Sequence, residues 1–80
     1  MDPRGSVREF LAAHCPGELE DDDDIFALGL VNSLFAMQLV LFVEQEFDVV
    51  VEGGDLERDN FRSVNAITAL VERLVERRVA

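Results

Sequence analysis

The sequence predicts a small all-α protein, a bundle of three substantial helices and one short helix with a long first loop. Three runs of apolar residues recur at the spacing of three and four that marks one face of a helix. Proline, glycine and acidic residues separate these runs. The valines at 49–51 resemble a strand, but one isolated strand has no partner. Eighty residues suffice for one domain, so we expect a single domain over residues 1–80.

The first helix is predicted from a capping signal and the apolar stripe that follows it. Ser6 and Glu9 are spaced as a capping box, in which each side chain accepts a hydrogen bond from the other residue's backbone. The stripe at helical spacing consists of Val7, Phe10, Leu11 and His14. Pro16 and Gly17 then end the run, so we expect the helix to stop before them.

An acidic run at residues 18–24 predicts a solvated loop, because its charges repel one another. A calcium-binding loop of the EF-hand type needs alternating ligands and a glycine at its sixth position, and this run has neither. We therefore expect no metal site. The apolar residues Ile25, Phe26 and Leu28 are expected to hold the loop against the core, and Gly29 releases the backbone after them.

The chain is organised around a second helix, expected to begin at Asn32 or Ser33 and to end near Phe47. Side chains about 100° apart predict a core face of Ala36, Val40, Val43 and Phe47, with Leu39 and Met37 at its edges. The opposite face should carry Phe35, Gln38, Phe42 and Gln45, flanked by Leu34 and Leu41. So small a domain rarely buries a helix that is apolar all round, so part of this surface should contact other proteins.

The rest of the chain predicts an extended connector and a final helix. Val49–Val51 should pack inward as a connector, Gly53 and Gly54 should be flexible, and residues 56–60 should form one helical turn. Ser63 is expected to cap the last helix. Its core stripe is Val64, Ile67, Leu70, Val71, Leu74 and Val75.

The net charge and the single cysteine indicate which partners the protein binds and in which compartment it works. Seventeen acidic and seven basic residues give a net charge of −10, which argues against binding to nucleic acid. No apolar run is long enough to span a membrane, and the first residues form no signal region. The single cysteine excludes an internal disulfide, so we expect a cytoplasmic protein in a reducing compartment.

Catalytic residues are not expected. His14 and Cys15 are adjacent, but neighbours in sequence do not face each other on a helix, and no second histidine is present. We interpret Cys15 as a partly buried thiol beside the helix end. One histidine and one cysteine without a convergent acid-base set leave little for hydrolytic chemistry, so the protein should not itself be an enzyme.

Ser33 allows two interpretations. Asn32 or Ser33 can simply cap the second helix, as both residue types often do. Alternatively, Ser33 presents an exposed hydroxyl after a glycine-containing turn, and a phosphodiester on it would lie at the positive end of the helix. The second interpretation describes the attachment point of a phosphate-linked arm.

The stretch from Leu28 to Leu34, followed by a helix ending in residues 44–48, resembles the signature L-G-x-D-S-L…E-E-x-F of the acyl carrier protein family. The resemblance runs from the first helix through the last and implies a four-helix acyl-carrier bundle. It implies that Ser33 carries 4′-phosphopantetheine, transferred from coenzyme A by a phosphopantetheinyl transferase. The chain departs from the signature at Asn32, where aspartate is usual, and by one extra residue, Leu30 or Val31.

Residues 31–40 and 60–64 also resemble a narrower subgroup, the discrete carriers of methoxymalonyl, hydroxymalonyl or aminomalonyl extender units. This resemblance implies a role in polyketide and antibiotic biosynthesis. The implied partners are acyl-loading and tailoring enzymes and a polyketide synthase acyltransferase, which a monomer would visit in turn.

The helix after Ser33 is expected to supply the partner-docking surface, through apolar contact and through acidic residues that attract basic partners. The predicted docking residues are Leu34, Phe35, Met37, Gln38, Leu41, Phe42, Glu44 and Glu46. Two alternatives remain open. One is an acidic helical interaction module without an arm, and the other is a peptidyl or aminoacyl carrier.

Overall fold

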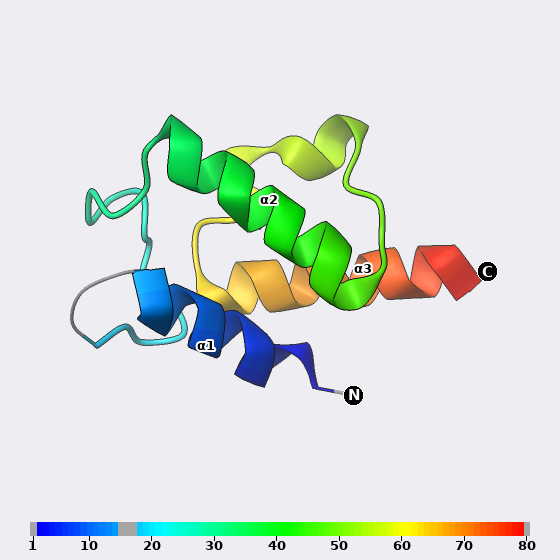
Figure 1. The fold of residues 1–80 in the computed structure, drawn as a ribbon, viewed down its shortest axis with the longest axis horizontal. Helices are drawn as coiled ribbons and strands as arrows, with labels where there is room; N and C mark the ends of the chain where they lie inside the picture. The colour runs from blue at the N-terminus through cyan, green and yellow to red at the C-terminus, as the bar shows by residue number, and fades with distance from the viewer. Residues whose placement is uncertain (1, 15–17, 80) are drawn as a thin grey trace.

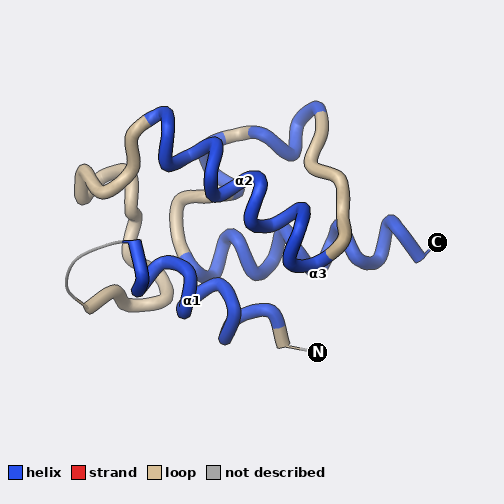
Figure 2. Tube along the Cα trace, in the orientation of Figure 1, coloured by secondary structure: helices blue, strands red, loops and turns tan. Residues whose placement is uncertain are grey.

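The computed structural model describes residues 2–14 and 18–79, and all regular structure within them is helical. The α-helices are α1 (Pro3–His14), α2 (Ser33–Phe47) and α3 (Val64–Val79), as Figure 1 shows. Two 3-10 helices, η1 (Gly53–Leu56) and η2 (Arg58–Asn60), lie between α2 and α3 (Figure 2). The prediction of a small all-α fold is therefore confirmed. The predicted fourth helix is replaced by two short 3-10 turns.

The helix α1 begins three residues before the predicted capping box. Asp2 Oδ1 accepts a hydrogen bond from Arg4 N at 3.0 Å, and Pro3 takes the first helical position, where its missing N–H costs nothing. Ser6 and Glu9 lie inside the helix, so the capping-box prediction is wrong. Asp2 and Pro3 start the helix before Ser6, so the Ser6–Glu9 pattern lies within the helix although it resembles a helix start.

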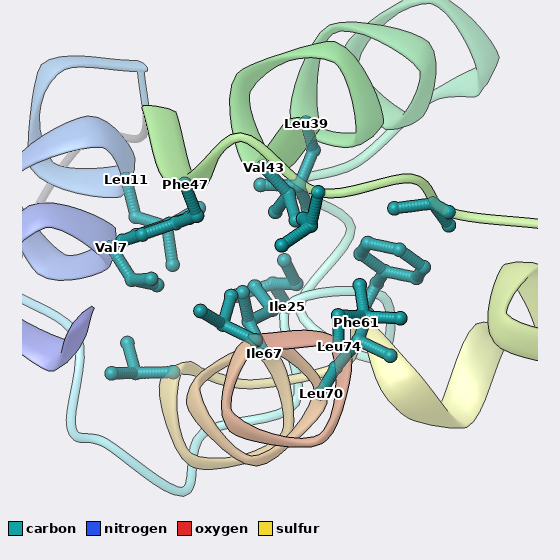
Figure 3. Close-up of a cluster of buried hydrophobic side chains, with 14 of the residues drawn as sticks. Val7, Leu11, Ile25, Leu39, Val43, Phe47, Phe61, Ile67, Leu70 and Leu74 are labelled. Carbon is teal, nitrogen blue, oxygen red and sulfur yellow. The ribbon is translucent and has the colours of Figure 1, made fainter. Parts of the chain in front are cut away.

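The core is centred on α3, which contacts α1, α2 and η2. Figure 3 shows side chains from all three α-helices meeting there, together with Ile25 from the long first loop. The predicted stripe of α3 is confirmed, since Val64, Ile67, Leu70, Val71 and Leu74 are buried and Val75 is half-buried. Ser63 Oγ accepts from Ala66 N at 3.1 Å, which confirms the predicted cap.

The helix α2 is rotated relative to the predicted phase. Its buried residues are Phe35, Leu39, Val43 and Phe47, whereas Ala36 and Val40 are only half-buried. The prediction that Phe35 and Phe42 lie on the outer face is wrong. Their rings stack on Phe10 of α1, with ring centroids 5.9 and 4.2 Å away. Helical spacing alone treats all apolar residues alike, but α1 offers an aromatic surface that these two rings pack against.

The connector after α2 packs inward as predicted. Val49 and Val51 are buried, while Val50 between them is exposed, as in any extended segment. The helix ends at Asp48, whose φ of 54° lies in the left-handed region. Arg78 of α3 donates to the carbonyl oxygens of Phe47 and Asp48 at 3.2 and 2.7 Å, so the two helix ends are joined.

Glycines and a break in the backbone explain why residues 53–60 form no α-helix. Gly53 and Gly54 begin η1 and favour helix poorly. Glu57, with ψ of 143°, is extended and separates η1 from η2. Asp55 fastens this segment to α3, because its Oδ2 accepts from Arg77 Nη2 at 2.5 Å and from Glu52 N at 3.2 Å. The hydrogen bond from Arg77 lowers the pKa of the Asp55 carboxyl below its ordinary value.

Candidate functional site

Ser33 is the first residue of α2, and its side chain is exposed. The capping role belongs to Asn32, whose Oδ1 accepts from Phe35 N at 2.8 Å while its carbonyl oxygen accepts from Ala36 N at 2.9 Å. This geometry decides between the two residues that the sequence left open as the cap. Because Asn32 performs the capping, the Ser33 hydroxyl is not needed for it and faces solvent.

The loop before Ser33 is held by backbone and side-chain hydrogen bonds. Asp24 Oδ1 accepts from Phe26 N and Ala27 N at 3.0 and 3.1 Å. Ile25 is fully buried and its N–H donates to Arg62 O at 2.7 Å. The prediction that Ile25 pins the loop to the core is thus confirmed, whereas Leu28 is exposed and contributes nothing to that anchor. A fixed loop presents Ser33 in a constant position.

The start of α2 suits a phosphate group. The first N–H groups of a helix have no partner within it and point outward, at the positive end of the helix dipole. Those of Phe35 and Ala36 are bonded to Asn32. The N–H groups of Ser33 and Leu34 are thereby left to a phosphate carried on the Ser33 hydroxyl. A serine-linked phosphodiester therefore fits the residues present.

An exposed apolar stripe runs down α2 from this point. Leu34, Met37 and Leu41 are 68%, 66% and 50% exposed, although they are large apolar residues. They stand at helical spacing on one face, directly after Ser33. Gln38, exposed beside them, is the polar member of this face. This stripe of Leu34, Met37 and Leu41, called the α2 stripe below, is apolar surface that the core does not use.

The other predicted docking residues differ in their surroundings. Phe35 is buried and Phe42 is half-buried, so neither is fully presented to a partner. Glu46 is exposed, but Glu44 is half-buried and its Oε2 accepts from Val51 N at 3.0 Å. Glu44 thus fixes the connector, and Glu46 is the acidic residue of the two that a partner can reach. The docking roles themselves stay predictions.

The described residues hold no group of three or more histidine, cysteine and acidic side chains placed to bind a metal. His14 is exposed and stacks on Phe10, with ring centroids 4.3 Å apart. Cys15, predicted to be partly buried, lies outside the described residues. No helix among those described is both long and apolar enough to cross a membrane.

Arg58 is a residue that sequence reasoning missed. It lies in η2 between Glu57 and Asp59, a pattern typical of an ordinary solvated turn. In the structure its guanidinium carbon lies 4.8 Å from the centroid of the Phe26 ring, and both residues line a cavity next to α2. The two are far apart in the sequence, so no local pattern could have paired them.

Comparison with known proteins adds the family. The family model described as "Phosphopantetheine attachment site" matches residues 5–71, from α1 into α3. The match contains Ser33 and the exposed start of α2.

Named relatives cover the chain almost completely. The D-alanyl carrier protein of Leuconostoc mesenteroides is 30% identical over 77 residues, and the match covers 94% of this chain and 99% of the relative. That of Lactobacillus acidophilus is 32% identical over 76 residues, covering 92% and 96%. That of Bacillus subtilis strain 168 is 30% identical over 77 residues, covering 92% and 99%. The similarity therefore spans whole proteins of about this length.

Proposed function

The chain belongs to the family of phosphopantetheine attachment domains, the acyl and peptidyl carrier proteins, and we propose from this premise that Ser33 bears the arm. The cofactor of the family is 4′-phosphopantetheine. One observation carries the assignment to Ser33: its exposed hydroxyl stands at the first position of α2, where Asn32 has taken over the cap. The protein then acts as a carrier of an acyl group and is not itself an enzyme.

The residues of this chain hold and present the arm. When bound, the arm supplies a terminal thiol that carries the acyl group as a thioester. The N–H groups at the start of α2 favour the phosphate on Ser33, and the loop anchored by Ile25 fixes where the arm begins. Tethering raises the concentration of the acyl group at each enzyme that docks the carrier.

We propose that the cargo is a substituted malonyl extender unit for polyketide biosynthesis. Support comes from residues 31–40 and 60–64, which resemble discrete carriers of such units. A second candidate is an aminoacyl cargo, which the names of the D-alanyl carrier relatives favour. The two cargos differ in charge, since a malonyl group ends in a carboxylate and an alanyl group bears an ammonium.

The proposed partners are a phosphopantetheinyl transferase, acyl-loading and tailoring enzymes, and a polyketide synthase acyltransferase. The transferase must reach the Ser33 hydroxyl, and the other enzymes must reach the thiol of the arm that begins there, so we expect each to dock near the start of α2. The α2 stripe offers apolar contact there, and Glu46 offers charge to basic docking sites. A few well-packed residues near the centre of an interface usually carry most of its affinity.

Mass spectrometry tests the attachment. The apo protein is incubated with coenzyme A, magnesium and a broad-specificity phosphopantetheinyl transferase. We expect one phosphopantetheine to be added to the wild type. The control variant Ser6→Ala, which replaces a serine in α1, should be modified in the same way. We expect Ser33→Ala to stay unmodified. An unchanged wild-type mass, or addition that survives Ser33→Ala, would overturn the carrier proposal and favour an interaction module without an arm.

The cargo needs a separate measurement. The holo protein is incubated with its loading enzymes, and the mass of the loaded form is determined. A gain equal to a substituted malonyl group supports the extender-unit proposal. A gain equal to an amino acid residue contradicts that proposal while leaving group carriage intact.

A further inference from the structure

An apolar cavity of about 210 Å³ lies beside α2 on the side of Ser33. Its lining residues are Phe26, Ala36, Val40, Leu56, Arg58 and Phe61. Ala36 and Val40 stand three and seven residues after Ser33, so they share its face of the helix. At about 1.5 Å per residue, Val40 lies about 10 Å along the helix from Ser33. An extended phosphopantetheine arm is longer than this, so its end can fold back to the cavity.

The cavity contains one cationic side chain, Arg58, and its situation is unlike that of the other arginines. Five of the seven form ion pairs with acidic residues, namely Arg4, Arg8, Arg62, Arg77 and Arg78. Arg73 donates to Asn60 Oδ1 at 3.0 Å. In the part of the chain that the structure describes, Arg58 forms neither an ion pair nor a side-chain hydrogen bond. An uncompensated arginine is unexpected in a chain with seventeen acidic residues.

Phe26 holds this cation at the cavity. The Arg58 guanidinium carbon lies 4.8 Å from the centroid of the Phe26 ring, a cation–π contact. Among the described residues no acceptor is bonded to the guanidinium N–H groups, which are therefore available to a ligand at the cavity. Those groups match the two oxygens of a carboxylate, which arginine binds in a bidentate manner. The cavity thus combines an apolar wall with the hydrogen-bond donors of Arg58, which can bind one small anion.

We propose that Arg58 is a specificity-determining residue that receives the free carboxylate of the cargo, while the apolar wall accepts the rest of the acyl group. The proposal rests on the proposed carrier function and names its substrate class: short acyl groups with a terminal carboxylate, of the malonyl type. An aminoacyl cargo would bring an ammonium toward the guanidinium, and the two charges would repel. Arg58 therefore favours the extender-unit cargo over the aminoacyl one.

Nuclear magnetic resonance on the intact protein tests this assignment. A broad-specificity transferase is used to transfer malonyl- or acetyl-phosphopantetheine from the corresponding coenzyme A thioester to the apo protein, and mass confirms each load. The Arg58 Nε–H signal and the methyl signals of Val40 and Leu56 are then compared between forms. We expect the malonyl form to shift these signals relative to the unloaded holo form. We expect the acetyl form, which lacks the carboxylate, to leave Arg58 Nε–H in place.

Variants identify the residue responsible. Arg58→Gln should lose the malonyl-specific shifts at Val40 and Leu56, and Arg58→Lys should retain part of them because it keeps the positive charge. Arg62→Gln is the matched control, since it removes another exposed arginine close in the sequence, whose ion pair is with Asp59. It should keep the shifts in full. Unchanged backbone signals in α2 and α3 verify that each variant is folded.

Three outcomes would overturn the proposal. The first is an equal Arg58 shift in the malonyl and acetyl forms. The second is a shift of Arg58 Nε–H between the apo and the unloaded holo protein that loading with malonyl leaves unchanged, which would assign Arg58 to the phosphate of the arm. The third is survival of the malonyl-specific methyl shifts in Arg58→Gln. Failure of the carrier function itself looks different, because the apo protein would then gain no mass from either thioester.

Discussion

Leu39 and Leu41 stand two residues apart in α2, yet their environments are opposite. Leu39 is fully buried, and Leu41 is 50% exposed. The same contrast extends along the helix. Its buried face consists of Phe35, Leu39, Val43 and Phe47, and its exposed face consists of Ser33 and the α2 stripe. Apart from Ser33 and Gln38 these residues of both faces are apolar, so hydrophobicity alone does not separate Leu39 from Leu41.

The comparison separates two uses of apolar surface. On one face the side chains pack against α1 and α3. Each Å² of apolar surface removed from water there stabilises the fold by about 25 cal/mol. On the other face at least half of each stripe side chain stays in water and is available to a docking enzyme. The position of Ser33 beside the exposed face suits this division, because an enzyme that acts on the arm must approach from there.

The largest expected effect comes from a pair of matched truncations. Leu39→Ala should lower the free energy of unfolding by about 2–5 kcal/mol, since it leaves a cavity in the core. Leu41→Ala should change it by less than about 1 kcal/mol, because half of that side chain is already in water. Urea denaturation monitored by circular dichroism measures both. Equal losses would mean that the two faces do not differ as the structure describes.

A charge on the exposed face should affect partners more than folding. Met37→Glu places a carboxylate in the α2 stripe, and we expect the rate of acyl loading, as kcat/KM, to fall about tenfold, or about 1.4 kcal/mol. Thermal stability should be nearly unchanged, because Met37 is exposed. Phe35→Glu is the contrasting variant, since a charge at this buried position should destabilise the protein itself.

Loading assays and melting curves on the same two variants decide the matter. Met37→Glu should melt like the wild type and load poorly, while Phe35→Glu should melt early. If Met37→Glu loads normally while Glu46→Gln fails, docking depends on charge and the α2 stripe has another purpose.

How far the sequence predicts this molecule depends on whether a feature is local. The ends of α2, the stripe of α3 and the Ser63 cap follow from spacing and nearby residues, and the structure confirms them. The phase of α2 does not, because it depends on how Phe10 of α1 meets Phe35 and Phe42. Periodicity counts apolar residues but cannot identify their partners.

The candidate site divides in the same way. Ser33 was predictable, because a helix start, a glycine turn and a signature all lie within a few residues. Arg58 was not, because its contact with Phe26 joins residues 32 positions apart. That Arg58 has no ion pair within residues 2–14 and 18–79 likewise depends on where the acidic side chains lie in three dimensions. Glu44 shows the converse, since an acidic residue that looked available for docking is bonded to Val51 N.

Loss of the Asn32 cap should lower stability less than loss of a core side chain does. The cap holds the start of α2, where Ser33 and the buried Phe35 stand close together. Asn32→Ala removes the acceptor for Phe35 N and should cost about 1 kcal/mol of stability. In a domain of this size that lowers Tm by about 4–8 °C. Asn32→Asp keeps an acceptor oxygen and serves as the control, with stability close to the wild type. Calorimetry measures both variants. A wild-type Tm for Asn32→Ala would show that this hydrogen bond does not hold the start of α2.

The smallest expected effect lies away from α2, where Asp55 and Arg77 join η1 to the end of α3. The hydrogen bond from Arg77 lowers the pKa of Asp55, so the folded protein favours the carboxylate. The resulting stabilisation is present above the pKa of an unfolded aspartate, about 3.9, and is lost as the pH falls through the lower pKa of the folded state. It is small because the Arg77 side chain is 56% exposed and water screens the pair.

Asp55→Asn tests this interpretation. At pH 7 the variant should be slightly less stable than the wild type, and the difference should shrink as the pH falls below about 4. Asp59→Asn is the control, since its carboxylate is 80% exposed and 3.7 Å from Arg62. Asp59→Asn should match the wild type at pH 7. Urea denaturation at several pH values provides the measurement. A difference between Asp55→Asn and the wild type that persists undiminished in acid would mean that packing, and not the charge on Asp55, holds η1 against α3.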